Sequence, residues 1–337
     1  MRGGPVRVLL RPVIYLLAAS LLVLVGNAAY ASPSVPVLPV RAAQPRQVAS
    51  PIAASRPVPP VTTVLASSAF DQLQIDLRAI AAKSGARVGI SLQELSGPRR
   101  TSLSIGGNQS FYAASTYKLP LLMAEAQQIA AGLASGSDRL CFAPSDAEDG
   151  WFTDYAVGSC FTRDALALRT GRYSDNTAAH ILVRYLGGPS ALNAYAKSIG
   201  MTASALWIPN TTTPDDLTAA WVNESLGRLG GITAQHWLAS LLVRTAFEQG
   251  IPAGIPASAT VAHKVGMLGG KELDSAYVVN GRIAYVLSVA ADGPNEATGW
   301  SVIAKVSARI WQYESSRPDF VAPIVKPLAP SPRPNRH

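Results

Sequence analysis

The stretch Ser115-Thr116-Tyr117-Lys118 decides how the rest of this chain is interpreted, because a strand-like segment, 111–114, gives way to a helical pattern there. The apolar positions that follow recur every three or four residues, as on one buried helix face: Leu119, Leu122, Met123, Ala126, Ile129, Ala130 and Leu133. We therefore predict a helix that opens at Ser115. Ser115 and Lys118 would lie three residues apart on neighbouring turns, with the amine within reach of the hydroxyl.

A serine at a helix N-terminus beside a lysine has two features that nucleophilic catalysis requires. Free serine is a poor nucleophile near neutral pH and needs an adjacent base and stabilisation of the developing oxyanion. The unpaired N–H groups and positive dipole end of a helix N-terminus favour negative charge. Lys118 can act as the base only if burial and a second cation lower its pKa, because an ammonium group accepts no proton. The alternative is an ordinary N-cap serine followed by a solvated lysine.

The composition indicates a folded protein whose net charge lies mostly near its ends. Of the 337 residues, 48% are hydrophobic and 15% are charged, and the formal net charge is +8. Residues 1–64 hold six arginines and no acidic residue, residues 317–337 carry a net charge of +3, and residues 65–316 carry −1. The central part lacks the excess of basic residues that phosphate binding requires, so we expect no nucleic-acid partner.

Residues 1–31 have the pattern of a secretory signal peptide. Arg2, Arg7 and Arg11 precede an apolar run over 13–25, and Ala29-Tyr30-Ala31 is a small-x-small cleavage site. The alternative is an uncleaved membrane anchor. Both interpretations predict that the remainder is extracytoplasmic, whether secreted, periplasmic or at the cell surface.

Proline-rich segments flank the expected domain. Residues 32–66 are rich in Pro and Ala and are interpreted as a linker, and 317–337 as a disordered Pro-rich tail. The folded, catalytic part is therefore expected over 67–316.

Cys141 and Cys160 are the only two cysteines of the chain. An even pair in an exported chain predicts a disulfide bond. Closing a loop of about 20 residues contributes roughly 3 kcal/mol and would stiffen a connection near Ser115. Two buried free thiols are the alternative.

Two further motifs follow in the chain. Ser174-Asp175-Asn176 lies between two helical segments, and Lys264-Val265-Gly266 lies in a strand-like segment. Lys264 supplies the second cation that Lys118 requires. Ser-x-x-Lys, Ser-Asp-Asn and Lys-x-Gly in this order resemble the motif set of class A β-lactamases and penicillin-binding proteins. The resemblance extends over about 67–313.

The resemblance implies an α+β fold with three layers, in which helices cover both sides of an antiparallel sheet, beside an all-helical subdomain. The active site would lie between the sheet and the helical subdomain. Four residues would carry the catalysis: Ser115 as the acylated nucleophile, Lys118 as its base or proton relay, Ser174 as the proton donor to the leaving nitrogen, and Lys264 as the cation that holds Ser174 and the substrate carboxylate.

The same resemblance implies the residues that bind the substrate. Asn176 would bind the amide of the substrate side chain, and Gly266 would let the substrate approach the backbone of its strand. The backbone N–H groups of Ser115 and Met267 would form an oxyanion hole, in which each donor typically contributes about 3 kcal/mol.

Two positions depart from the class A pattern. Class A members carry a glutamate in the loop after Ser-Asp-Asn that activates the deacylating water, whereas this chain has no Asp or Glu between Asp175 and Asp215. Without that base the acyl-enzyme is expected to hydrolyse slowly, as in penicillin-binding proteins, unless Asp215, Asp216 or Glu224 substitutes. Val265 replaces the usual Thr or Ser, which removes a hydrogen bond worth roughly 1 kcal/mol.

These features predict an exported, monomeric serine acyl-hydrolase, β-lactamase-like, that is acylated at Ser115 by β-lactam or related amide substrates. A D-alanyl-peptide carboxypeptidase or transpeptidase of the penicillin-binding type is one alternative, and a non-hydrolytic module that binds the cell wall is another. We expect no cofactor and no metal, because the four histidines lie in no zinc pattern. The same histidines, His180, His236, His263 and His337, lie in no Ser-His-Asp motif.

Overall fold

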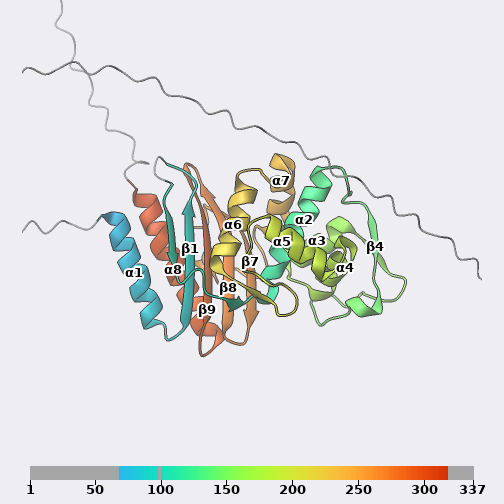
Figure 1. Ribbon diagram of the computed structural model, residues 1–337, viewed down its shortest axis with the longest axis horizontal. Helices are drawn as coiled ribbons and strands as arrows, with labels where there is room; N and C mark the ends of the chain where they lie inside the picture. Colours follow the sequence, from blue (N-terminus) through green and yellow to red (C-terminus); the bar gives the residue numbers. More distant parts are fainter. Residues whose placement is uncertain (1–67, 98–99, 318–337) are drawn as a thin grey trace, which may run out of the picture. The chain divides into compact units, whose positions relative to one another are not determined.

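The computed structural model describes residues 68–97 and 100–317, and its centre is a five-stranded antiparallel sheet (Figure 1). The strands are, in spatial order, β2 (Ser102–Ile105), β1 (Arg87–Glu94), β9 (Ile283–Asp292), β8 (Lys271–Asn280) and β7 (Thr260–Leu268). Gly281 has a φ of 58° in the turn that joins β8 to β9. Such left-handed turns favour glycine, and Asn280-Gly281 is a typical sequence for a two-residue hairpin turn.

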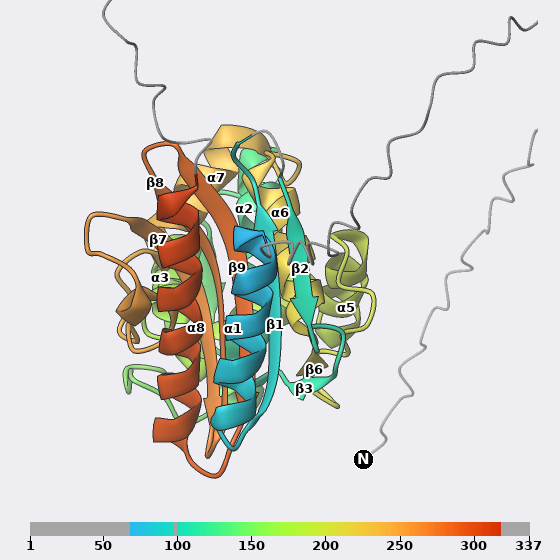
Figure 2. The same ribbon diagram turned by 90° about the vertical axis from the view of Figure 1, so that its left-hand side faces the viewer.

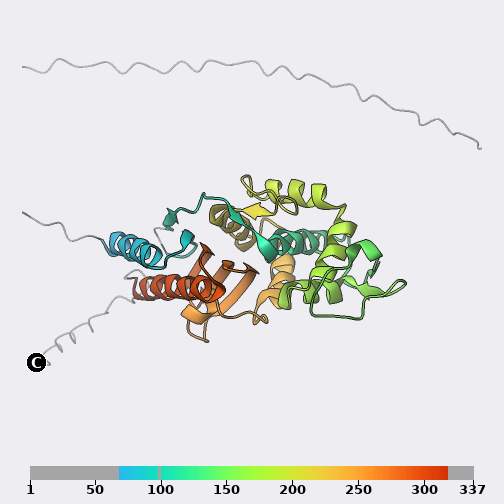
Figure 3. The same cartoon turned by 90° about the horizontal axis from the view of Figure 1, so that it is seen from below.

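Helices cover both faces of the sheet, as the α+β, three-layer fold requires. The first and last helices, α1 (Ala69–Lys83) and α8 (Glu296–Ser316), pack side by side on one face (Figures 2 and 3). Helix α6 (Pro214–Ser225) packs on the other face, against β1, β8 and β9. Residues of β9 alternate between the two sides: Leu287 and Val289 join the core with α8, whereas Val286 and Ala290 join the core with α6.

A group of helices lies beside the sheet and forms the helical subdomain. Its members are α2 (Lys118–Ala130), α3 (Arg163–Arg172), α4 (Asn176–Leu186), α5 (Pro189–Ser198) and α7 (Gly231–Leu242). Helix α2 contacts α3, α4, α5 and α7, and its buried residues lie in the same hydrophobic core as α6. Helix α2 is apolar on nearly all sides because these neighbours surround it.

Side chains cap several helices. Five helices begin after a residue whose side chain accepts a hydrogen bond from a backbone N–H of the first turn: Ser68, Thr162, Asp175, Thr213 and Asn295. Asp175 is the middle residue of the Ser-Asp-Asn motif, so this motif is also the beginning of α4.

Small elements complete the fold around Ser115. Strand β3 (Phe111–Tyr112) pairs with β6 (Thr211–Thr212), and β4 (Arg139–Cys141) pairs with β5 (Cys160–Thr162). The structure pairs Cys141 with Cys160 in a disulfide, as expected. The 3-10 turns η2 (Pro144–Asp146) and η3 (Ile251–Gly254) lie in connecting loops.

Both ends of α2 and the beginning of the expected tail differ from the expected boundaries. Leu133 lies beyond the end of α2 and is 80% exposed, because the chain turns away at Gly132, which has a φ of 70°. The α-helix after Ser115 begins only at Lys118, since a 3-10 turn precedes it. Arg317, which we assigned to the tail, is 1% exposed and forms ion pairs with Glu94 and Glu314.

The expected signal peptide or anchor, most of the expected linker, and residues 318–337 of the tail lie outside the described residues. Within 68–97 and 100–317, no helix is both long enough and apolar enough to cross a membrane.

Candidate active site

Ser115 lies in a 3-10 turn, η1 (Ala114–Tyr117), that leads directly into α2. Ala114 has a φ of 44°, and its carbonyl accepts a hydrogen bond from Asn210, so the turn is tied to the loop before β6. Lys118 is the first residue of α2, and its Nζ lies 3.1 Å from Ser115 Oγ. The Ser-x-x-Lys spacing therefore brings amine and hydroxyl together, through a 3-10 turn rather than an α-helical one.

Lys118 is fully buried and is surrounded by oxygen atoms of the Ser-Asp-Asn motif. Its Nζ donates to Ser174 O at 2.6 Å and to Asn176 Oδ1 at 2.6 Å. Burial lowers the pKa of Lys118 to about 7, although the charges of Asp175 and Glu148 oppose this shift. A substantial fraction of Lys118 is thus a neutral amine near neutral pH, as a base for Ser115 must be.

Lys264, on β7, completes the cluster. Its Nζ lies 2.9 Å from Ser174 Oγ, and Ser174 has a left-handed φ of 57° that places its hydroxyl between the two lysines. Burial, and then the charge of Lys118, lower the pKa of Lys264 well below its usual value. We expected burial and Lys264 together to lower the pKa of Lys118; burial does so, whereas the charge effect between the two lysines acts on Lys264.

Gly266 is required by packing between β7 and η1. A Cβ atom at this position would lie 2.5 Å from Ala113 O, so only glycine allows the strand to approach the turn that carries Ser115. We expected Gly266 to let the substrate approach the backbone; this packing is a second reason for glycine here, and the substrate role stays a prediction. Val265, in turn, is buried and places no hydroxyl near Lys264.

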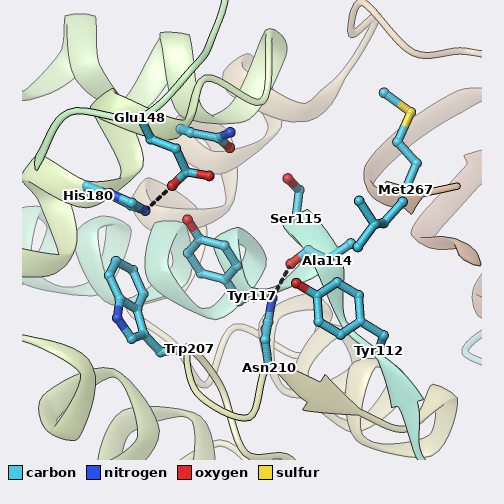
Figure 4. Close-up of a pocket in the computed structure, with 11 residues that line it drawn as sticks. Tyr112, Ala114, Ser115, Tyr117, Glu148, His180, Trp207, Asn210 and Met267 are labelled. Carbon is cyan, nitrogen blue, oxygen red and sulfur yellow. Dashed lines mark hydrogen bonds and ion pairs between the residues drawn. The ribbon is translucent and has the colours of Figure 1, made fainter.

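Two cavities meet at Ser115. One, of about 360 Å³, is lined among others by Tyr112, Glu148, His180, Trp207 and Asn210 (Figure 4). The other, of about 490 Å³, is lined by residues of all three motifs and by an aromatic pair: Ser115, Ser174, Asn176, Val265, Met267, Trp151 and Phe247.

The loop that the disulfide closes is attached to the Ser-Asp-Asn turn. Asp175 Oδ2 accepts hydrogen bonds from the backbone N–H groups of Trp151 (3.0 Å) and Phe152 (3.3 Å). Asn176 Nδ2 donates to Asp149 O at 2.9 Å. A Cβ atom at Gly150 would lie 2.5 Å from Asp175 Oδ2, so this contact also depends on a glycine. The loop therefore forms one wall of the site.

Two polar residues beside Ser115 were not expected: Glu148, on this loop, and His180, on α4. His180 Nε2 lies 2.7 Å from Glu148 Oε2, and the ring of His180 lies 4.6 Å from that of Trp207, between centroids. Neither Glu148 nor His180 lies in a motif, and 32 positions separate them. The available signal was indirect: the cysteine pair brackets Glu148, and His180 lies one helical turn after Asn176.

The three acidic residues considered as substitutes for the missing loop glutamate do not line either cavity at Ser115. Asp215 accepts from Ser104 Oγ at 3.0 Å, and Asp216 from Ser204 Oγ at 2.7 Å. Glu224 lines a separate cavity of about 220 Å³, where burial raises its pKa to about 7. No group of three or more His, Cys, Asp or Glu side chains in the described part of the chain is arranged to hold a metal ion.

A family model, described as the beta-lactamase enzyme family (Beta-lactamase2), matches residues 72–314. The chain belongs to this family. A beta-lactamase of Rhodobacter capsulatus is 35% identical over 146 residues, which are 43% of this chain and 49% of the relative. Beta-lactamase CTX-M-25 of Escherichia coli is 29% identical over 211 residues, which are 58% of this chain and 72% of that protein.

Solved structures agree with the family. The structure of PBP-A superposes with a TM-score of 0.67 at 26% identity, over 72% of this chain and 95% of PBP-A. A class A beta-lactamase from Mycobacterium abscessus superposes with a TM-score of 0.65 at 25% identity, over 71% and 98%. The expected fold is therefore confirmed, and the chain is a class A β-lactamase-like serine hydrolase.

Proposed function

We propose that this β-lactamase-family protein is an exported enzyme that β-lactams and related amides acylate at Ser115. The contact between Lys118 Nζ and Ser115 Oγ, 3.1 Å, carries this proposal. Lys118 has both the position and, with a pKa of about 7, the protonation state that a base for Ser115 needs.

Acylation then follows from the contacts around Lys118. The neutral amine takes the proton of Ser115 as Oγ bonds to the substrate carbonyl, and the backbone N–H groups of Ser115 and Met267 hold the oxyanion. Ser174, 2.9 Å from Lys264 and 3.4 Å from Lys118, gives its proton to the nitrogen as the amide bond breaks and takes up the proton that Lys118 received from Ser115. Lys264 also attracts the substrate carboxylate, without help from a hydroxyl at Val265. Asn176 orients the substrate amide.

Hydrolysis of the acyl-enzyme is the step in which this chain departs from class A enzymes. The segment 177–214 contains no Asp or Glu, so no carboxylate from that segment can activate a water molecule. We infer that deacylation is slow compared with acylation. The same observation favours one second candidate, a penicillin-binding carboxypeptidase or transpeptidase whose substrate is a D-alanyl peptide of the cell wall.

Labelling with a fluorescent penicillin, followed by intact mass over time, tests this function. We expect one adduct per chain in the wild type and no adduct in Ser115→Ala. An adduct that decays indicates a lactamase, and one that persists indicates the penicillin-binding candidate.

Ser301→Ala is the matched control, because this serine is exposed on α8, away from both cavities. It should label like the wild type, and thermal melting should show that Ser115→Ala remains folded. Labelling that survives in folded Ser115→Ala would refute the nucleophile assignment. A folded wild type that never labels would refute the proposed function and favour a non-hydrolytic module.

A further inference from the structure

The smaller cavity at Ser115 has one carboxylate among its lining residues, and this carboxylate contacts a histidine. Glu148 Oε2 lies 2.7 Å from His180 Nε2, and both side chains line the cavity together with Ser115. In Figure 4 the second carboxylate oxygen of Glu148 points towards the side of the cavity where the Ser115 hydroxyl lies. This oxygen is available to a water molecule in the cavity.

The backbone of Glu148 is fixed beside the Ser-Asp-Asn motif. The hydroxyl of Thr177 accepts from Glu148 N at 3.0 Å and donates to Glu148 O at 2.7 Å. Thr177 is itself 3% exposed and directly follows Asn176, which binds Lys118. The carboxylate therefore extends from a backbone segment that is tied to the catalytic cluster.

His180 is fixed from the other side. It lies on α4, and its ring contacts that of Trp207, which in turn contacts Tyr117 at 5.7 Å between centroids. Burial lowers the pKa of His180, Lys118 lowers it further, and Glu148 and Asp146 oppose the shift. A neutral His180 can donate its Nε2–H to Glu148 Oε2, so the second oxygen of the Glu148 side chain takes no part in this contact.

We propose that Glu148 accepts the proton of the water molecule that hydrolyses the acyl-enzyme, and that His180 positions Glu148 for this step. The inference rests on the proposed acylation of Ser115. In class A enzymes the glutamate that activates the water follows the Ser-Asp-Asn motif in the sequence. In this chain the proposed residue, Glu148, precedes the motif.

The step balances with one water molecule. Glu148 takes a proton while the water oxygen bonds to the acyl carbon, and the oxyanion hole holds the negative charge. As the bond between this carbon and Ser115 Oγ breaks, the proton returns from Glu148 to Oγ. The products are the free acid and Ser115, and Glu148 is again a carboxylate.

The test separates acylation from deacylation. Penicillin-labelled Glu148→Gln, freed of excess reagent, should lose its adduct at least about 100-fold more slowly than the wild type, as expected when a general base is removed. Its rate of label formation should stay within about 10-fold of wild type, which also shows that the variant is folded.

Glu248→Gln is the matched control. Glu248 also contacts a histidine, His263, at 3.2 Å, and its side chain is 46% exposed against 47% for Glu148. Glu248 lines neither cavity at Ser115, so the adduct of this variant should decay at the wild-type rate.

His180 is tested by comparing Gln and Ala at its position. His180→Gln keeps an N–H donor and should retain most of the deacylation rate, whereas His180→Ala should lose it without losing acylation. A merely structural role would affect acylation and deacylation together in both variants.

The outcomes distinguish the two proposals. If the wild-type adduct forms and decays, and Glu148→Gln decays at the same rate, the role of Glu148 is refuted and acylation at Ser115 stands. A wild-type adduct that never decays also refutes the role of Glu148 alone. If no adduct forms on the folded wild type, the proposed function fails as well.

Discussion

In the proposed function, the protonation state of Lys118 decides the reactivity of Ser115. Because the pKa of Lys118 is about 7, the neutral fraction falls about tenfold per pH unit below this value. We predict that the rate of labelling by penicillin rises with pH up to about 7 and then levels off. Stopped-flow fluorescence between pH 5 and 9 measures this profile.

Lys118→Arg is the variant that tests this assignment. Arginine keeps the positive charge and cannot be deprotonated, so labelling should be at least about 100-fold slower at every pH. Two results would contradict the role of Lys118 as base. One is a wild-type labelling rate that does not rise with pH up to about 7, and the other is an arginine variant that labels at the wild-type rate.

Residues of the candidate active site that lie in motifs could be predicted from the sequence, and those outside motifs could not. Ser115 and Lys118 are three positions apart, and their contact follows from local geometry alone. Ser174 and Lys264 were found because their motifs resemble those of a known family. Glu148 and His180 were missed because they come together only when the loop closed by the disulfide folds onto α4, and no local pattern records that contact.

At the scale of elements, the loop between Cys141 and Cys160 carries both Glu148 and the backbone N–H groups that bind Asp175. The double variant Cys141→Ser, Cys160→Ser should lose about 3 kcal/mol of unfolding free energy, since a loop of this length is no longer closed in the unfolded chain. Urea denaturation measures the loss.

The same double variant should affect the two half-reactions unequally. Lys118 and Ser115 lie outside the loop, so acylation should fall less than deacylation, which depends on the position of Glu148. Wild type treated with a reductant should behave like the variant. Equal loss of both rates would show that the loop supports the whole site rather than Glu148.

The junction between β7 and η1 is the second element-scale test. Gly266→Ala places a methyl group about 2.5 Å from Ala113 O, so β7 and η1 must separate. Overpacking of this kind costs about 1–3 kcal/mol, and we predict this loss in unfolding free energy and slower acylation. In Gly293→Ala the nearest atom is the Ala86 methyl at 3.2 Å, so a smaller effect is expected there.

At the scale of the whole molecule, the resemblance to class A β-lactamases predicted the three layers, and the sequence pattern predicted individual elements. Alternating apolar residues in β1 and β2, the Asn-Gly turn between β8 and β9, and the periodic faces of α1 and α8 indicate these elements. The ends of helices are harder to predict: the apolar residues Trp237, Leu238, Leu241, Leu242 and Phe247, followed by Gly250, predict a helix to Gly250, but α7 ends at Leu242. Tertiary contacts decide where α7 ends: Val243, the residue after its last turn, forms an isolated antiparallel β-bridge with Ala262 of β7.

Buried charge makes the stability of the whole molecule depend on pH. His263 is fully buried between Asp274, at 2.9 Å, and Glu248, at 3.2 Å. Burial alone lowers its pKa, but the charge of Asp274 and hydrogen bonds to both carboxylates outweigh burial and raise the pKa to about 9. Lys118 and Lys264 act in the opposite direction, because their pKa values are lowered and they favour the folded state more as pH rises.

The contribution of His263 to the unfolding free energy must therefore be measured as the difference between wild type and a variant that lacks this histidine. Since its pKa rises from 6.5 in the unfolded chain to about 9, the folded state gains up to about 3 kcal/mol below pH 6.5 and loses it as pH rises through 9. The gap in unfolding free energy between wild type and His263→Gln should shrink accordingly between pH 6 and 9.5. Both lysines are present in the two proteins, so their opposing effect cancels from the gap. A gap that stays constant over this range, measured by urea denaturation, would show that the pKa of His263 is not raised in the folded protein.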